Sequence, residues 1–228
     1  MHEIFLKTVN STNTYAKENI TSIKTPCLIT ADEQTAGRGR RGNSFFSPKN
    51  TGLYMTVVFS SPENCELLTP AAAVAVCHVL KKHGTQPHIK WVNDIFMNGR
   101  KVCGILTERF SCGQNSFIAL GVGINLTTES FPENLPAAGS INLECDKAEL
   151  AREIAQKILK YAENPDDESV VSEYCKFLFV VGKNITYSKN NVEYSAVVNS
   201  INEQCNLIVT RTDGTQDILS SGEISIKI

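Results

Sequence analysis

The apolar pattern of the chain changes after residue 183. Before that point, stretches with the alternation of a β-strand lie between stretches with the spacing of an α-helix. Residues 184–228 instead carry only short apolar runs separated by Asn, Gly and Asp turns. The pattern predicts a mixed α/β domain over residues 1–180 and a small all-β domain over residues 181–228. A β-domain of that size is marginally stable alone, so we expect it to dock on the larger one.

The expected elements of the larger domain follow from periodicity and from turn residues. Asn98-Gly99 favours a hairpin turn between the strands 88–92 and 101–109, which flank a linker at 93–100. Ser11, Thr12 or Asn13 is expected to cap a helix that follows a first strand at 3–7. Further strands are expected at 26–34, 51–60 and 116–126, helices at 70–83, 146–163 and 172–183, a connector at 164–169, and strands of the small domain at 184–189, 192–201, 205–211 and 223–228.

Composition excludes several classes of protein. A formal net charge of -2 argues against a protein that binds nucleic acid mainly through electrostatics. The longest apolar stretches, such as residues 71–80, are too short to span a bilayer, and the N-terminus lacks a signal peptide, so we expect a cytoplasmic protein. The eight cysteines include no C-x-x-C pair and are expected to be free thiols, and the four histidines show no metal-ligand spacing.

Glycine alternates with arginine from Gly37 to Gly42. The glycines allow backbone N–H groups to approach a ligand closely, and the three guanidinium groups offer paired donors suited to phosphate or carboxylate. Arg-Gly runs also occur in disordered nucleic-acid-binding tails, but this single copy lies between two apolar strands. The run lacks the lysine and hydroxyl residue that close a P-loop. It predicts an irregular loop that wraps a phosphorylated ligand.

A second polar cluster is expected around the hairpin. If the strands pair across Asn98-Gly99, Asp94 and Lys101 lie close together. A lysine on a rigid strand can neutralise charge on a transferred acyl or phosphoryl group, and Asn93 and Asp94 could bind nucleotide or a magnesium ion carried by ATP. A surface salt bridge and a turn asparagine explain the same residues, and spacing alone favours that simpler interpretation.

Five motifs in order resemble biotin protein ligases. They are STN at 11–13, EQTAGRGRRG at 33–42, KWVND at 90–94, KVCGIL at 101–106 and GVGIN at 121–125. The resemblance runs from Ser11 to the SGEISI segment near the end of the chain. Lipoate ligases share the fold of this family but lack the arginine loop signature.

The resemblance implies a mixed α/β core like that of class II aminoacyl-tRNA synthetases, joined to a C-terminal SH3-like β-barrel. It also implies a reaction in which the biotin carboxylate attacks the α-phosphate of ATP to give biotinyl-5′-adenylate and pyrophosphate. The ATP is expected to carry a Mg2+ ion. A lysine of a biotin carboxyl carrier domain, as in acetyl-CoA carboxylase, then attacks the mixed anhydride. The rival activities are lipoate or octanoate transfer on the same fold, and non-enzymatic nucleotide or RNA binding.

Roles follow from the matching motifs, residue by residue. Lys101, Arg38 and Arg40 are implied to be catalytic. The residues implied to bind biotin are Ser11, Thr12, Asn13, Gln34, Arg38, Gly39, Arg40 and Lys101. The residues implied to bind ATP are Arg40, Arg41, Asn93, Asp94 and Asn125. The only metal implied is the magnesium ion that ATP carries, near Asp94. Helix capping by Ser11 or Thr12, a polar strand end at Gln34 and a turn at Asn125 are the competing explanations.

The sequence departs from the family at three points. Val92 stands where the family usually has proline, and Phe45 stands where a tryptophan commonly follows the arginine loop, which is expected to alter an apolar contact on the adenine side. The STN motif begins at Ser11, which leaves no room for the helix-turn-helix domain of many members, so we expect no DNA binding. A monomer and a homodimer both remain open. Trp91 is expected to be a core or pocket-wall residue.

Overall fold

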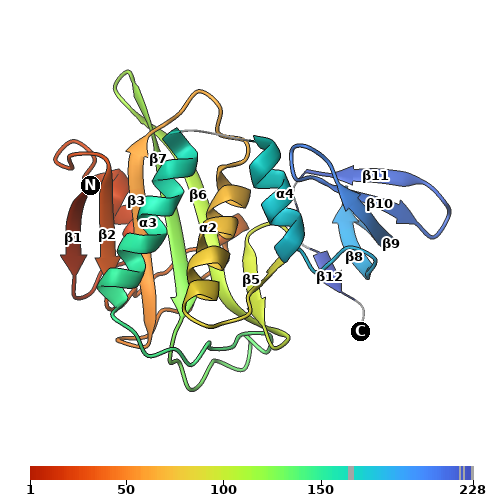
Figure 1. Ribbon diagram of the computed structural model, residues 1–228, viewed down its shortest axis with the longest axis horizontal. Helices are drawn as coiled ribbons and strands as arrows, with labels where there is room; N and C mark the ends of the chain where they lie inside the picture. The colour runs from red at the N-terminus through yellow and green to blue at the C-terminus, as the bar shows by residue number, and fades with distance from the viewer. Residues whose placement is uncertain (164–166, 221, 223, 227–228) are drawn as a thin grey trace.

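A computed structural model describes residues 1–163, 167–220, 222 and 224–226, apart from the side chain of Asp167. Its main layer is a seven-stranded mixed sheet in the order β1-β2-β3-β7-β6-β5-β4, beside which lies a second, five-stranded sheet (Figure 1). β1 pairs with β2 in parallel, and the other neighbours in the main sheet are antiparallel. The strands of the main sheet are β1 (His2–Leu6), β2 (Cys27–Ala31), β3 (Gly52–Ser60), β4 (His88–Lys90), β5 (Asp94–Met97), β6 (Arg100–Cys112) and β7 (Asn115–Asn125).

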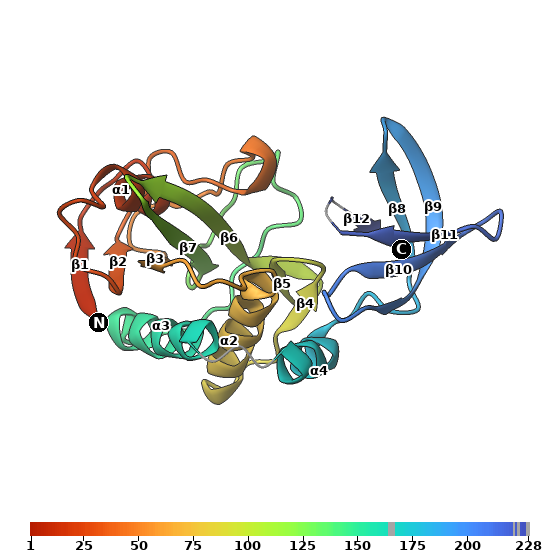
Figure 2. The same ribbon diagram turned by 90° about the horizontal axis from the view of Figure 1, so that it is seen from above.

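Helices cover both faces of the main sheet (Figure 2). α2 (Leu68–Lys82) and α3 (Lys147–Glu163) lie on one face, and the short α1 (Thr12–Glu18) lies on the other. α2 carries an almost continuous run of buried Ala and Val residues, because it is packed between the sheet, α3 and α4 (Asp167–Phe177). α3 is instead amphipathic and buries one stripe that includes Leu150 and Ile154. The mixed α/β fold predicted from the sequence is confirmed.

The hairpin differs from its prediction in one respect. The linker expected at 93–100 contains a strand, β5, which pairs with both β4 and β6. Ile95 at the centre of β5 is fully buried, so this short apolar segment is stabilised as a strand by packing. Both residues of the predicted Asn98-Gly99 turn have positive φ, but the turn joins β5 to β6, so the expected pairing of strands 88–92 and 101–109 is wrong.

The last helix also differs from its prediction. The sequence suggested a helix at 172–183, whereas α4 spans Asp167–Phe177 and so includes the end of the connector expected at 164–169. The rest of that connector, residues 164–166, lies outside the described residues. Leu178 and Phe179 continue as an extended segment beside β4, where Phe179 N donates to Ile89 O, because pairing with this strand replaces further helical turns.

The second sheet has the order β11-β10-β9-β8-β12. Its strands are β8 (Asn184–Lys189), β9 (Val192–Ile201), β10 (Leu207–Arg211), β11 (Gln216–Leu219) and β12 (Ile224–Ile226). The sequence did not predict β11, and part of its last expected strand lies outside the described residues. The described pairings leave β11 and β12 at opposite edges, so closure into a barrel stays a prediction.

The two sheets share one hydrophobic core. Buried residues of the small sheet, such as Ile185 and Leu207, belong to the same apolar cluster as α2 and the main sheet. The Trp91 indole N–H donates to Cys205 O at 2.7 Å. Trp91 is 4% exposed, belongs to this core and also lines a cavity, so the prediction of a core or pocket-wall residue is confirmed. All eight cysteines are free thiols, as predicted. Within the described residues, no helix is long and apolar enough to cross a membrane.

Candidate functional site

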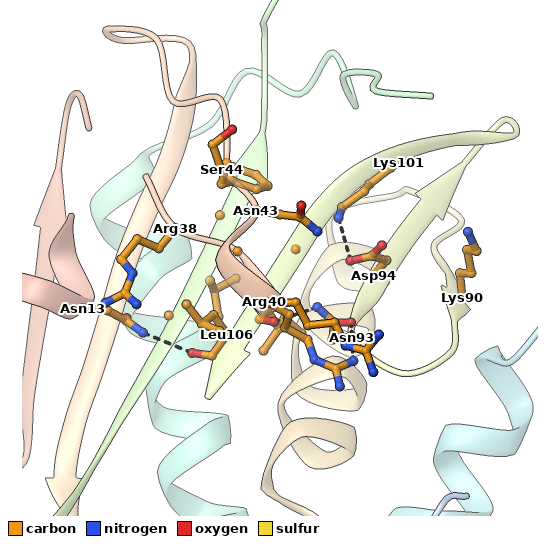
Figure 3. A pocket seen from close by; sticks show the side chains of 18 of the residues that line it. Asn13, Arg38, Arg40, Asn43, Ser44, Lys90, Asn93, Asp94, Lys101 and Leu106 are labelled. Atoms are coloured by element: carbon orange, nitrogen blue, oxygen red, sulfur yellow. Dashed lines mark hydrogen bonds and ion pairs between the residues drawn. The ribbon is translucent and has the colours of Figure 1, made fainter. Parts of the chain in front are cut away.

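A cavity of about 500 Å³ lies between the start of α1, the glycine–arginine loop and strands β5 to β7. Figure 3 shows Asn13 and Arg38 at one end of it, Lys101 and Asp94 at the other, and Arg40 between them. All but one of the residues that the sequence assigned to the site line this cavity: Ser11, Thr12, Asn13, Gln34, Arg38, Gly39, Arg40, Arg41, Asn93, Asp94 and Lys101. The exception is Asn125.

A buried polar cluster forms the first end of the cavity. Ser11, Thr12 and Asn13 are each 3% exposed. Ser11 is the N-cap of α1, where its hydroxyl accepts from Thr14 N, so the capping predicted from the sequence is confirmed. The Gln34 carboxamide oxygen accepts from both the backbone N–H and the hydroxyl of Thr12, at 2.9 and 3.1 Å. The helix start therefore fixes these polar side chains at the cavity wall.

Thr56 on β3 lies beneath this cluster and is fully buried. Its hydroxyl lies 2.8 Å from Thr12 Oγ1 and 2.6 Å from Asn13 Oδ1. Asn13 Nδ2 donates on the opposite side, to Leu106 O at 3.2 Å and to Glu108 Oε2 at 2.9 Å. A donor beside its oxygen and acceptors beside its nitrogen define the orientation of the Asn13 carboxamide.

Backbone hydrogen bonds close the glycine–arginine loop on itself. Gly39 N donates to Asn43 O, and Phe45 N donates to Gly37 O. Asn43 N donates to Arg40 O across a tight turn in which Arg41 has a φ of 55°, outside the helical region. Because Arg41 and Gly42 both have positive φ, this segment is a turn and not a helix, in agreement with the irregular loop predicted from the sequence. Glycine is required at position 37, where a Cβ atom would lie 2.4 Å from Phe45 O.

Two cations lie along the cavity from this loop to β6. Arg40 Nη1 donates to Asn93 Oδ1 at 3.2 Å, and Asn93 Nδ2 donates to Ile105 O, which anchors that side chain to β6. Lys101 Nζ lies 2.7 Å from Asp94 Oδ1, which confirms the predicted proximity across the hairpin. Asp94 Oδ1 is buried, and no donor among the described residues is aligned with it for a hydrogen bond. Its contact with Lys101 is therefore an ion pair without a hydrogen bond.

Phe45 packs against a glycine pair in the sheet. Gly104 on β6 and Gly123 on β7 are register partners, and Cβ atoms there would lie 3.2 and 2.4 Å from the Phe45 ring. Gly121 makes similar room for Asn13, since its Cβ would lie 2.5 Å from Asn13 Oδ1. The glycines of KVCGIL and GVGIN therefore leave room for the side chains of Phe45 and Asn13, which larger residues at these positions would exclude.

Asn125 has a different environment from the other predicted site residues. It is 4% exposed, its Nδ2 donates to Gly139 O at 2.9 Å, and its backbone carbonyl accepts from Ile141 N. The segment around Gly139 also bonds the backbone of Lys101, through Lys101 N to Ala137 O and Gly139 N to Lys101 O. Asn125 thus holds a segment beside Lys101, and its nucleotide-side role stays a prediction.

The sequence did not identify several residues of the site. Thr56, Glu108 and Lys17 surround the polar cluster, while Asn134, Leu135, Gly222, Ile224 and Ser225 complete the cavity wall. A threonine within the apolar run of β3 was the one local signal available. The contribution of the C-terminal strand has no local signal, because it depends on how the small sheet docks.

Comparisons with known proteins agree on one family. Residues 5–125 match the Biotin/lipoate A/B protein ligase family. The chain is 27% identical over 235 residues to the Bifunctional ligase/repressor BirA of Escherichia coli, covering 97% of this chain and 73% of that protein.

Solved structures give the same result. A biotin protein ligase from Aquifex aeolicus, solved with biotin and ATP, has a TM-score of 0.82 at 23% identity, covering 99% of this chain and 98% of that one. A biotin protein ligase from Leishmania major, solved with biotinyl-5-AMP, has a TM-score of 0.64 at 25% identity, covering 96% and 99%. The chain belongs to the biotin/lipoate A/B protein ligase family.

Proposed function

We propose that this chain is a biotin protein ligase, which activates biotin with ATP as biotinyl-5′-adenylate and transfers the biotinyl group to a lysine of a carrier protein. The observation that carries the choice among acids is the buried polar cluster at the start of α1. Relatives of the chain include a protein named biotin--[acetyl-CoA-carboxylase] ligase and a biotin protein ligase structure solved with biotin and ATP. The cluster argues for biotin on its own chemistry.

The cluster complements a ureido group. Asn13 Oδ1 accepts one hydrogen bond, from Thr56, among the described residues, and a carboxamide oxygen can accept two. Gln34 Nε2 donates to Ser47 Oγ and has a second proton. A ureido ring supplies two N–H donors and one carbonyl acceptor, whereas the dithiolane of lipoate or the alkyl chain of octanoate would leave the second acceptor site of Asn13 and the second proton of Gln34 unsatisfied. Leaving a buried polar group unpaired costs about 1–3 kcal/mol, which supports selection of biotin.

The cations along the cavity suit an acyl phosphate. A carboxylate becomes a good acyl donor only after adenylation, and the charge that develops at the α-phosphate needs fixed cations. Lys101, Arg38 and Arg40 line the cavity and are proposed to bind the biotin carboxylate and the α-phosphate. The glycine–arginine loop is proposed to exclude water from the mixed anhydride. Gly39 is proposed to contact biotin through its backbone.

Asn93, Asp94 and Arg41 are proposed to face the nucleotide, with Asn125 acting on the same side. Within the part of the chain that the structure describes, no group of three or more His, Cys, Asp or Glu side chains could hold a metal ion. Magnesium commonly binds substrate phosphates with one or two carboxylates, and Asp94 offers one in the cavity. Magnesium is therefore proposed to arrive with ATP.

The finer architecture belongs to the same proposal. The core over residues 1–180 is proposed to be of the class II synthetase type, and the segment 181–228 to be an SH3-like domain that docks through Trp91 and Cys205. The carrier is proposed to be a biotin carboxyl carrier domain, as in acetyl-CoA carboxylase. A cytoplasmic location stays a prediction from the sequence.

The test is acid selectivity. The protein is incubated with ATP and magnesium plus biotin, lipoate or octanoate, and the acyl adenylate is detected by mass spectrometry. Adenylate from biotin alone is expected, and adenylate from lipoate or octanoate alone would refute the proposal. A non-enzymatic nucleotide-binding or RNA-binding module would yield no adenylate with any acid, and its affinity would fall steeply with salt.

A further inference from the structure

Glu108 on β6 links the polar cluster to the arginine loop. Its carboxylate lies 2.9 Å from Lys17 Nζ and 3.5 Å from Arg38 Nη1 through Oε1, and it accepts from Asn13 Nδ2 at 2.9 Å through Oε2. The side chain is 20% exposed. One carboxylate therefore contacts a residue from α1, the proposed biotin contact Asn13 and the first arginine of the loop.

Glu108 carries its charge at neutral pH. Burial raises the pKa of its carboxyl group, but hydrogen bonds from Lys17 and Asn13 and the charges of Lys17 and Arg38 outweigh that effect, so the net pKa is lowered. An ionised acceptor makes a stronger hydrogen bond than a neutral one. The bond to Asn13 is therefore the strongest of those that orient its carboxamide nitrogen.

The contact with Asn13 determines what that side chain offers the cavity. Nδ2 has two protons, and three acceptors surround it: Leu106 O, Glu108 Oε2 and Ala119 O. Its donors are thus consumed by the protein, while Oδ1, which accepts from Thr56, has capacity for a second hydrogen bond. Without Glu108, only the longer contacts to Leu106 O at 3.2 Å and Ala119 O at 3.4 Å would oppose rotation of the carboxamide. A rotated carboxamide would present a donor to the N–H group of a ligand, which would repel it.

The contact with Arg38 is weaker and reversible. The pair is separated by 3.5 Å, and the Arg38 side chain is 47% exposed, so little free energy holds it. Arg38 also lines the cavity, where an acyl phosphate would offer a second anion. Glu108 and such a ligand therefore compete for the same guanidinium group.

We propose that Glu108 is a positioning residue with two roles. It orients Asn13 as an acceptor for the N–H group of the acid. It also holds Arg38 beside the cavity until the acyl phosphate takes the place of Glu108 as the partner of Arg38. The inference rests on the proposed function and adds to it a residue that couples recognition of the acid to closure of the loop. Glu108 acts through Asn13 and Arg38 and touches no reacting atom.

Two substitutions separate the two contacts. Glu108→Ala removes both, and biotin Kd measured by calorimetry is expected to rise about 10- to 100-fold. KM for biotin in ATP–pyrophosphate exchange should rise in parallel, with kcat at saturating biotin nearly unchanged, which a general loss of folding would not produce. Glu108→Gln keeps an oxygen for Asn13, so biotin Kd should stay within about threefold of wild type.

The glutamine variant also tests the competition for Arg38. With the carboxylate charge removed, radiolabelled adenylate is expected to dissociate about two- to fivefold more slowly. In an Arg38→Ala background, Glu108→Gln should have no effect on this rate, because the coupled partner is absent. Glu153→Gln, which alters a glutamate paired with Lys82 on the helical face, is the matched control and should match wild type.

The outcomes are distinguishable. If wild type binds biotin and Glu108→Ala binds it equally well, the positioning role is overturned while the proposed function stands. An equal effect of Glu108→Gln with and without Arg38 would overturn the coupling. If wild type binds no biotin, the proposed function fails and this inference fails with it.

Discussion

Phe45 packs against Gly104 and Gly123, and alanine at these two positions should have effects of different size. A Cβ atom at Gly123 would lie 2.4 Å from Phe45 Cε1 and 2.8 Å from Cζ, whereas one at Gly104 would lie 3.2 Å from the ring. Carbon atoms pack at about 3.5 Å. Gly123→Ala therefore requires the Phe45 ring to move by about 1 Å, and Gly104→Ala requires it to move by about 0.3 Å. Neither glycine has a positive φ, so the backbone accepts alanine at both positions.

The displacement should cost both stability and activity. Overpacking of this size destabilises by about 1–3 kcal/mol, and the milder contact at Gly104 should cost under about 1 kcal/mol. Phe45 N donates to Gly37 O, so movement of the ring also moves the loop that carries Arg38 and Arg40. A misplacement of about 1 Å near the reacting groups can reduce a rate about 100-fold, so Gly123→Ala is expected to slow biotin-dependent ATP–pyrophosphate exchange by about 10- to 100-fold.

The assay combines urea unfolding with pyrophosphate exchange. Phe45→Ala removes the clashing ring, so adding it to Gly123→Ala should restore exchange to within about threefold of Phe45→Ala alone. The reasoning is refuted if Gly123→Ala has wild-type stability and rate, or if Gly104→Ala is as damaging as Gly123→Ala.

Three further predictions follow from other contacts. Lys101→Ala should abolish biotin-dependent ATP–pyrophosphate exchange with the far-UV circular dichroism intact, and near-normal exchange would remove Lys101 from the mechanism. Arg40→Gly should release the adenylate prematurely, seen as labelling of bystander lysines, and unchanged retention of radiolabelled adenylate on the enzyme would count against that role. Hydrogen bonds from Lys189 and Tyr187 lower the pKa of Asp217 to about 2, so its contribution of about 1–2 kcal/mol should be present above about pH 4 and lost as pH falls toward 2. Urea unfolding of Asp217→Asn and wild type across this range should converge at the acid end, and a constant difference would contradict the assignment.

Local signals in the sequence were enough for the residues that are neighbours in the chain. The capping role of Ser11 depends on the first turn of α1 alone, and the contact between Asp94 and Lys101 depends on the turn at Asn98-Gly99. Both could therefore be predicted. β5 was missed because its four residues carry too short an apolar pattern to separate a strand from a linker.

The residues that the sequence missed are positioned by register. Thr56 and Glu108 reach Asn13 only because β3, β7 and β6 pair as they do, with Thr56 opposite Gly121 and Glu108 opposite Ala119. A register shift of one residue in β3 would turn Thr56 to the other face of the sheet, and the same shift in β6 would turn Glu108. Local propensity does not determine such pairings, and the same holds for the approach of Ser225 to the cavity.

The proposed function depends most on where the arginine loop lies when an acyl phosphate is bound. The direct measurement is a crystal structure with a non-hydrolysable analogue of biotinyl-5′-adenylate. We expect Arg38, Arg40 and Lys101 to contact the phosphate and carboxylate groups, and Asn13 and Gln34 to form hydrogen bonds with the ureido ring. Guanidinium groups facing open solvent, away from Lys101 and the ligand, would contradict the proposed function.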